Sequence, residues 1–147
     1  MTITTGTLQI VLVEDSDDDF DTVCEALRLS GLPAELHRVS NGDECLALLR
    51  RGSLARPAFV LMDLNTSSTD GLDTLAQIKA DPLLKATPVV VVTTSAHPRD
   101  VDDCYHCGAN AYHVKPVSYP EHLQLLTGLL DYWIVAVRKP SAQRLLP

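Results

Sequence analysis

Polar side chains able to do chemistry follow four apolar runs of the sequence. Consecutive apolar residues without alternation are typical of strands covered on both faces, as in parallel α/β sheets. The carboxyl edge of such a sheet is where ligands bind. The residues at these four strand ends are Glu14 and Asp15, Asp63, Thr93, and Lys115. We therefore interpret Asp63, which follows the run 59–62, as the chemical centre and the other residues as its partners.

The charges of these side chains indicate a metal-assisted site. Three carboxylates close together repel one another unless positive charge separates them. Lys115 supplies one positive charge, and a Mg²⁺ ion bound through carboxylates, a carbonyl and waters would supply the rest. No glycine-rich loop follows the first apolar run, so the phosphate cradle of nucleotide and flavin binders is absent. A flavin binder or small-molecule enzyme on the same fold is therefore disfavoured.

Strands and helices that could position these residues alternate five times along the chain. Each apolar run is followed by a segment with helical periodicity, and that alternation is typical of a parallel sheet with helices on both faces. Right-handed crossovers leave few topologies. We predict a flavodoxin-like (βα)5 three-layer sandwich with strand order 2-1-3-4-5. The strands are expected at 8–13, 35–39, 59–62, 89–92 and 111–114.

Length and charge limit the classes of protein that the sequence can encode. The 147 residues fit a single domain, with a core at about 8–138 and a flexible tail at 139–147. A formal net charge of -7 argues against a nucleic-acid partner. We find neither a signal peptide nor an apolar run near the roughly 20 residues of a membrane helix. We therefore expect a cytoplasmic protein that does not bind membranes.

The four cysteines are expected to be free thiols in a reducing compartment. Cys104 and Cys107 have the spacing of a metal-binding pair, with His106 between them. Structural zinc sites need a second ligand pair at matching spacing, and the sequence lacks one. Two small apolar residues on a short helix are the favoured interpretation of this pair, with zinc as the minor alternative.

Taken together, these residues resemble a response-regulator receiver domain of two-component signalling. The resemblance covers about 8–138 and includes Asp70-Gly71 and Lys115-Pro116 in addition to the strand-end acids. More narrowly, three motifs and an aromatic pair resemble stand-alone receivers that serve bacterial and cyanobacterial phytochromes. They are Val-Glu-Asp-Ser at 13–16, Met-Asp-Leu-Asn at 62–65, Thr-Thr-Ser at 93–95, and Tyr132-Trp133.

The resemblance implies a role for each of these residues. Asp63 would accept a phosphoryl group from the phosphohistidine of a sensor histidine kinase, a bacteriophytochrome in the narrower resemblance. The chain would then be a phosphoacceptor that assists its own phosphorylation and dephosphorylation, and not an enzyme. The remaining implied roles are Mg²⁺ binding by Glu14, Asp15, Asp63 and the backbone carbonyl of Asn65; phosphoryl contact by Lys115; switching by Thr93 and Tyr112; and a cis peptide at Lys115-Pro116.

Two positions depart from the usual receiver pattern. Ser67 stands where the family usually has a proline, which predicts a softer loop after Asp63. Thr94 stands where many receivers carry a smaller residue, and could narrow access to the site.

A pseudo-receiver that dimerises without being phosphorylated is the alternative function, and the complete set of acids with Lys115 argues against it.

The last predicted helix, from about Ser118 to Arg138, is apolar on two sides. One stripe suits packing on the sheet, and a helix with a second apolar stripe usually hides it against another surface. We predict a symmetric homodimer through this helix. The alternative is that the tail or a neighbouring helix covers the second stripe. The predicted interface residues are Leu125, Leu129, Tyr132, Trp133 and Ala136.

Overall fold

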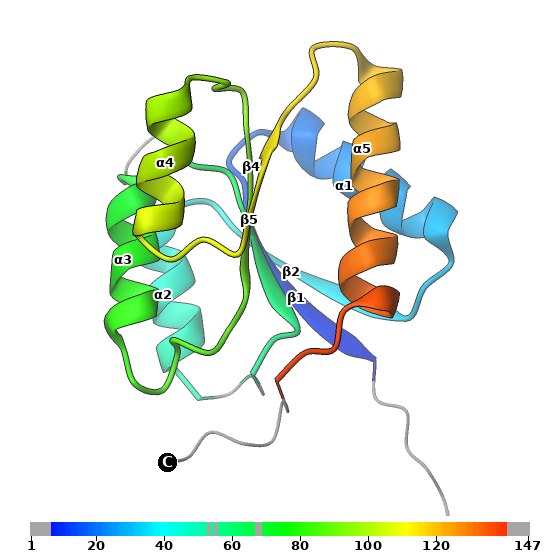
Figure 1. Cartoon of the computed structure of the whole chain (residues 1–147). Coiled ribbons are helices and arrows are strands. Elements are labelled where there is room, and N and C mark those ends of the chain that lie inside the picture. Colours follow the sequence, from blue (N-terminus) through cyan, green and yellow to red (C-terminus); the bar gives the residue numbers. More distant parts are fainter. Residues whose placement is uncertain (1–6, 53, 55, 67–68, 141–147) are drawn as a thin grey trace, which may run out of the picture.

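A five-stranded parallel sheet lies between two layers of helices (Figure 1). The computed structural model describes residues 7–52, 54, 56–66 and 69–140. The strand order β2-β1-β3-β4-β5 confirms the predicted flavodoxin-like topology. The strands are β1 (Leu8–Val13), β2 (Ala34–Val39), β3 (Phe59–Met62), β4 (Val89–Thr93) and β5 (Ala111–Val114). The helices are α1 (Asp17–Ser30), α2 (Gly42–Arg50), α3 (Gly71–Ala80), α4 (Pro98–His106) and α5 (Tyr119–Asp131).

The central strands are buried on both faces, as their unbroken apolar sequences predict. Alternate side chains of each strand enter two separate cores, because successive residues of a strand point to opposite faces. Helices α1 and α5 cover one face, while α2, α3 and α4 cover the other (Figure 1). In β3, for example, Phe59 and Leu61 belong to the first core, and Val60 and Met62 belong to the second.

Polar residues fix the helix starts that face the carboxyl edge of the sheet. Ser16 caps α1, and its side chain accepts a hydrogen bond from the backbone N–H of Asp19. Asp70 caps α3 in the same way through the N–H of Leu72. Such caps satisfy backbone donors that a helix leaves without intrahelical partners. The first turns of α1 and α3 are therefore anchored beside the strand ends.

The C-terminal helix ends earlier than its sequence pattern predicts. The α-helix stops at Asp131 and continues as a π-helical turn, η1 (Tyr132–Ala136), instead of running to about Arg138. Its signature is the i→i+5 hydrogen bond from the N–H of Val137 to the carbonyl of Tyr132, 2.9 Å long. Trp133 and Ile134 in this turn are both buried, and the Trp133 ring lies 5.9 Å from the ring of Phe59.

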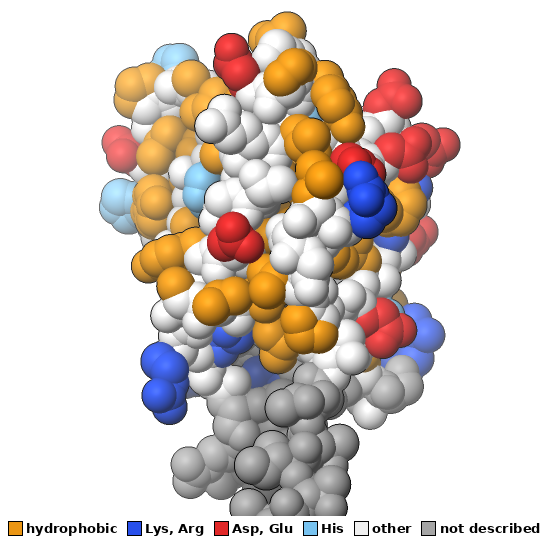
Figure 2. Space-filling view, turned by 90° about the vertical axis from the view of Figure 1, so that its right-hand side faces the viewer, with side chains coloured by type: hydrophobic (Ala, Val, Ile, Leu, Met, Phe, Trp, Pro, Cys, Tyr) orange, Lys and Arg blue, Asp and Glu red, His pale blue; other side chains and the backbone are white. Residues whose placement is uncertain are grey.

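The residues predicted for a dimer interface differ in their exposure to solvent. Leu129 and Trp133 are buried in the core of the single chain, so they offer no surface to a partner. Tyr132 and Ala136 are exposed, and Leu125 is half-buried. Figure 2 shows apolar side chains spread over the side formed by α1 and α5, with acidic side chains gathered at its right. Only part of the second apolar stripe of the last helix is therefore exposed and able to contact a second copy of the chain.

Three further expectations concern the peptide bond before Pro116, membrane-spanning helices, and the residues of one loop and the C-terminal tail. No peptide bond is cis among the described residues, so the expected cis bond before Pro116 is wrong. The trans form is the ground state even for proline, by about 0.5–1 kcal/mol. No helix within the described ranges is long and apolar enough to cross a membrane. Ser67 and most of the expected tail, 141–147, lie outside the described residues.

Two glycines offer a matched test of how tightly the loop after Asp63 is packed. A Cβ on Gly71 would lie 2.8 Å from the Cα of Leu64, whereas one on Gly128 would meet nothing within 4 Å. We expect Gly71→Ala to lower the free energy of unfolding by about 1–3 kcal/mol through overpacking. We expect Gly128→Ala to raise it by about 0.5–1 kcal/mol, because alanine favours a helix interior. Urea unfolding measures both values, and equal effects would contradict this packing.

Candidate functional site

The carboxylates of Glu14 and Asp63 come together because β1 and β3 are neighbours. Their register pairs Val13 with Met62, so the next residue of each strand leaves the sheet at the same edge. The N–H of Asp63 donates to the carbonyl of Val13 over 3.0 Å, which fixes this relation. Both residues are largely buried, with only 4% of the whole Glu14 residue and 9% of the whole Asp63 residue exposed.

Lys115 follows β5, the strand at one edge of the sheet, and its side chain reaches these acids at the ends of β1 and β3. Its backbone N–H donates to the carbonyl of Thr93 over 2.6 Å, so the end of β5 is tied to the end of β4. Its Nζ donates to Oδ2 of Asp63 at 3.0 Å and to Oε1 of Glu14 at 3.4 Å. Three of the predicted strand-end residues, Glu14, Asp63 and Lys115, therefore meet in one pocket.

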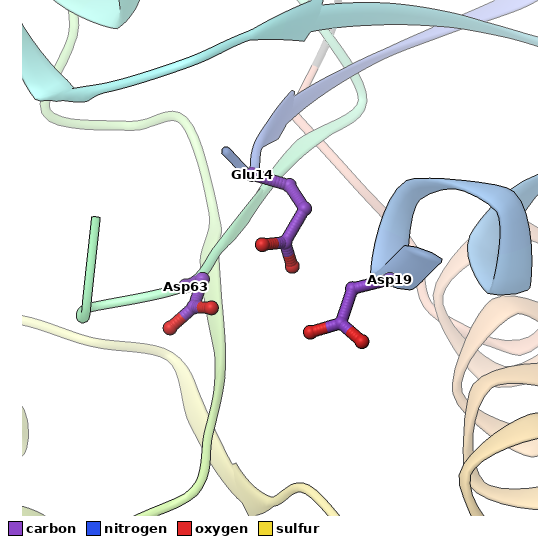
Figure 3. A group of neighbouring side chains, drawn as sticks. All are labelled: Glu14, Asp19 and Asp63. Atoms are coloured by element: carbon purple, nitrogen blue, oxygen red, sulfur yellow. The ribbon is translucent and has the colours of Figure 1, made fainter. Parts of the chain in front are cut away.

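A third carboxylate in this pocket, that of Asp19, was not predicted from the sequence. Asp19 lies in the first turn of α1, and its Oδ2 accepts from Nζ of Lys115 at 2.6 Å. Oxygen atoms of Glu14, Asp19 and Asp63 all lie within 4.8 Å of one another. Figure 3 shows the three carboxylates turned toward one shared space, from the ends of β1 and β3 and from α1. Acids at 17–19 lie in the first turn of α1, where they are also favourable charges at a helix start.

The structure places the other predicted ligands differently. Asp15 is exposed and is not one of the three carboxylates that converge. Asn65 is close to the site, because its backbone N–H donates to Oδ1 of Asp63 at 2.9 Å. Its side-chain amide donates to Oγ1 of Thr93, also at 2.9 Å. Asn65 therefore links the central aspartate to the hydroxyl at the end of β4.

Both residues predicted to form the switch have defined hydrogen bonds. Thr93 is buried and held by the Asn65 amide, so its hydroxyl is directed toward the loop after β3. Tyr112 is half-buried, and its hydroxyl donates to the carbonyl of Ser95 at 2.8 Å. The tyrosine ring is thus anchored to the loop between β4 and α4.

Arg38 supports the acidic loop after β1 through its guanidinium. Nε of Arg38 donates to the carbonyl of Glu14 at 2.9 Å, and a terminal nitrogen lies 2.9 Å from Asp17. The guanidinium also lies 4.5 Å from the ring centroid of Phe20. A planar guanidinium suits such combined hydrogen bonding and stacking. Arg38 therefore ties the end of β2 to the loop that carries Glu14.

Burial and crowding change the ionisation of the pocket. Burial raises the pKa of Glu14 to about 7, with the negative charge of Asp63 adding to the rise and Lys115 opposing it. Burial alone would lower the pKa of Lys115, but hydrogen bonds and charges from Asp19 and Asp63 raise it above its usual range. Lys115 is therefore held as a cation, while burial disfavours the ionised form of Glu14 in the metal-free pocket.

The donor set of this pocket fits a hard divalent cation. Carboxylate oxygens are the ligands that Mg²⁺ prefers, whereas zinc favours thiolates and imidazoles. Cys104 and Cys107 belong to no potential metal cluster among the described residues, and both are free thiols. Burial also raises the pKa of Cys104 to about 11, which disfavours the thiolate. The structure thus supports a carboxylate site and gives zinc no support.

An α/β sheet of this order, with carboxylates and a lysine at its carboxyl edge, is the arrangement expected of a receiver domain. The family model of the response regulator receiver domain matches residues 10–127. The chain belongs to this family, because the match covers most of its length.

Individual relatives point to a narrower branch of the family. Response regulator Rcp1 from Synechocystis sp. is 36% identical over 137 residues, which cover 90% of this chain and 93% of Rcp1. The structure of the phosphorylated cyanobacterial phytochrome response regulator RcpA aligns with a TM-score of 0.87 and 36% identity, covering 92% of this chain and all of RcpA. The Mn²⁺-bound form of Rcp1 aligns at 0.86 and 35% identity, covering 91% of this chain and 99% of that one. The chain is therefore related to phytochrome-associated regulators.

The raised pKa of Glu14 makes the stability of the metal-free protein depend on pH. The folded chain holds a proton up to about pH 7 that the unfolded chain releases near pH 4.5. This contribution to stability is therefore complete below pH 4.5 and is lost as the pH rises through 7. We expect the wild type to lose about 1–3 kcal/mol of unfolding free energy between these limits, relative to Glu14→Gln.

The measurement is urea unfolding in chelator from acidic to mildly alkaline pH, with wild type and Glu14→Gln in parallel. Parallel pH profiles for the two proteins would show that Glu14 does not hold this proton. Saturating Mg²⁺ is the control, since a bound cation favours the ionised carboxylate and reduces the difference.

Proposed function

We propose that this chain is a phosphoacceptor of two-component signalling, with Asp63 as the residue that is phosphorylated. The observation that supports this proposal most directly is the contact between Oδ2 of Asp63 and the Lys115 ammonium. These groups lie 3.0 Å apart, beside two further carboxylates. A nucleophile next to a fixed cation meets the main requirement of phosphoryl transfer, which is positioning and charge stabilisation. The donor is the phosphohistidine of a sensor histidine kinase.

The transfer itself is a displacement at phosphorus. A carboxylate oxygen of Asp63 attacks the phosphorus atom, and the bond from phosphorus to the histidine nitrogen breaks. The leaving nitrogen keeps the electron pair, and Asp63 becomes an acyl phosphate. Lys115 neutralises charge that develops on the phosphoryl oxygens, as its position beside Oδ2 permits. The acyl phosphate is later hydrolysed: water attacks phosphorus, the bond from phosphorus to the Asp63 oxygen breaks, and inorganic phosphate and the free carboxylate are released.

Glu14 and Asp63 are the side chains that would hold Mg²⁺, with Asp15 and the carbonyl of Asn65 as the further ligands implied by the resemblance. A bound Mg²⁺ supplies positive charge to phosphoryl oxygens during transfer. The related Rcp1 has been crystallised in a Mn²⁺-bound form, which supports a divalent ion in this pocket.

Phosphorylation would act on the rest of the molecule through Thr93 and Tyr112. The phosphate brings up to about two negative charges and new acceptor oxygens to Asp63. The Thr93 hydroxyl can then exchange its present bond with Asn65 for one with a phosphoryl oxygen. Because Tyr112 is hydrogen-bonded to Ser95 in the same β4–α4 loop, a shift of that loop moves the tyrosine's anchor. The two states therefore differ on the α4–β5 surface.

The kinase is proposed to be a phytochrome-type sensor, and the site of action the cytoplasm. Support for this branch comes from RcpA and Rcp1, of which RcpA is described as a cyanobacterial phytochrome response regulator. Residues 1–147 are proposed to act as one receiver domain whose output is contact with other proteins.

Phosphorylation can be tested with a small phosphodonor such as acetyl phosphate. We expect the intact mass of the wild type to rise by one phosphoryl group in the presence of Mg²⁺, and Asp63→Asn to stay unchanged, because the amide cannot attack. Asp70→Asn is the matched control, since Asp70 is exposed and only caps α3. An unmodified wild type would favour the pseudo-receiver alternative, whereas equal labelling of Asp63→Asn would show that a residue other than Asp63 accepts the phosphoryl group.

We also propose that two copies form a symmetric homodimer through the exposed part of the C-terminal helix region. Tyr132 is 58% exposed and Val135 is 64% exposed, next to the exposed Ala136. Contiguous exposed apolar side chains at the end of one helix suit a two-fold contact. Leu125 lies half-buried on the same helix and would form the edge of the contact.

Sedimentation at micromolar concentration tests the dimer. We expect Tyr132→Asp to weaken association at least about tenfold, because a buried unpaired charge replaces an aromatic contact. Leu83→Asp is the matched control, since Leu83 is 54% exposed on the loop before β4 and should leave the dimer intact. A monomeric wild type in both phosphorylation states would refute the dimer.

A further inference from the structure

Asp19 makes the shortest contact in the pocket, and the receiver resemblance gives it no role. Its Oδ2 lies 2.6 Å from Nζ of Lys115, compared with 3.0 Å for Asp63 and 3.4 Å for Glu14. The contact is not incidental to helix capping. The cap at Ser16 uses the backbone N–H of Asp19, so its carboxylate is left to bind the ammonium.

The ammonium of Lys115 occupies the space between the carboxylates that a divalent cation would use. A lysine ammonium has three donors, and here the three carboxylates of Glu14, Asp19 and Asp63 accept them. A cation that binds the same oxygens of Glu14 and Asp63 must therefore displace the ammonium from them. The displaced ammonium, which is only 8% exposed, needs another anionic partner to avoid a buried unpaired charge.

Asp19 is suited to be that partner. It belongs to α1, so it does not move with the strand ends that carry Glu14 and Asp63. Its side chain is 30% exposed, compared with 5% for Glu14 and 10% for Asp63, which places it at the rim of the pocket. Neighbouring groups do not duplicate it, because Asp18 and Asp21 are exposed on the same helix, and the salt bridges of Lys115 go to Glu14, Asp19 and Asp63.

We propose that Asp19 is a positioning residue for Lys115. It retains the ammonium on the α1 side of the pocket when a divalent cation takes up Glu14 and Asp63, and it thereby sets the affinity for that cation. Without this carboxylate, the ammonium falls back on Glu14 and Asp63 and competes with the cation for them. The inference rests on the proposed function, because it assumes that these two carboxylates bind a metal.

The test is Mn²⁺ binding to the purified full chain, measured by the electron paramagnetic resonance of the free ion. We expect Asp19→Asn to raise the dissociation constant about tenfold, the order of one charge interaction at a partly exposed site. Asp18→Asn and Asp21→Asn remove the same charge from the same helix and should change the constant less than about twofold. Asp19→Glu, which keeps the carboxylate, should restore most of the affinity.

A double-mutant cycle with Lys115→Ala separates positioning from direct ligation. If Asp19 acts through the ammonium, Asp19→Asn should change Mn²⁺ affinity less than about twofold once Lys115 is absent. An undiminished loss in that background would show that Asp19 is itself a ligand, and would overturn the proposal. An unchanged affinity of Asp19→Asn in the presence of Lys115 would also overturn it. A wild type that binds no Mn²⁺ would instead refute the metal site of the proposed function.

A second measurement does not depend on the folding of Lys115→Ala. The ¹⁵Nζ signal of the Lys115 ammonium is observable by NMR when its exchange with water is slow. We expect this signal to persist in the wild type at saturating Mg²⁺, because Asp19 keeps the ammonium bound, and to be lost in Asp19→Asn. Persistence of the ammonium signal in both proteins would contradict the positioning role. Circular dichroism is the control that both proteins are folded.

Discussion

The structure depends on how one ammonium, that of Lys115, balances three carboxylates at the edge of the sheet. Two unit charges about 4 Å apart interact by about 1 kcal/mol in water and about 4 kcal/mol at a typical protein surface. One lysine cannot neutralise Glu14, Asp19 and Asp63 together, and burial, with a smaller contribution from the charge of Asp63, raises the pKa of Glu14 to about 7. The pocket therefore favours added positive charge. A divalent cation or a change in the partners of Lys115 relieves this imbalance.

The fold keeps this imbalance in place because the sheet is buried on both sides. Two cores hold β1, β3 and β4 rigidly, so the strand ends cannot spread to separate their charges. The contacts that can exchange partners without disturbing the cores are polar ones. The bonds from Asn65 to Thr93 and from Tyr112 to Ser95 are of this kind. A charge change at Asp63 can thus alter the loop between β4 and α4 without disturbing the cores.

The sequence was sufficient to predict the sheet order and the meeting of Glu14, Asp63 and Lys115. Uninterrupted apolar runs indicate buried parallel strands, and parallel strands bring their carboxyl ends to one edge. Asp19 could not be found in this way, because its place depends on how the first turn of α1 is oriented above the sheet. The π-helical turn after Asp131 was missed for a similar reason. It places both Trp133 and Ile134 in the core, a packing requirement that helical periodicity does not contain.

The central claim, that Asp63 is the carboxylate that carries the phosphoryl group, is tested most directly by trapping the acyl phosphate. Borohydride reduces an aspartyl phosphate to homoserine, and peptide mass spectrometry then locates the modified residue. After treatment with a phosphodonor and Mg²⁺, we predict homoserine at position 63 and unmodified side chains at 14, 15 and 19. Homoserine at 15 or 19 instead of 63, or a reduced product at none of these positions, would contradict the account.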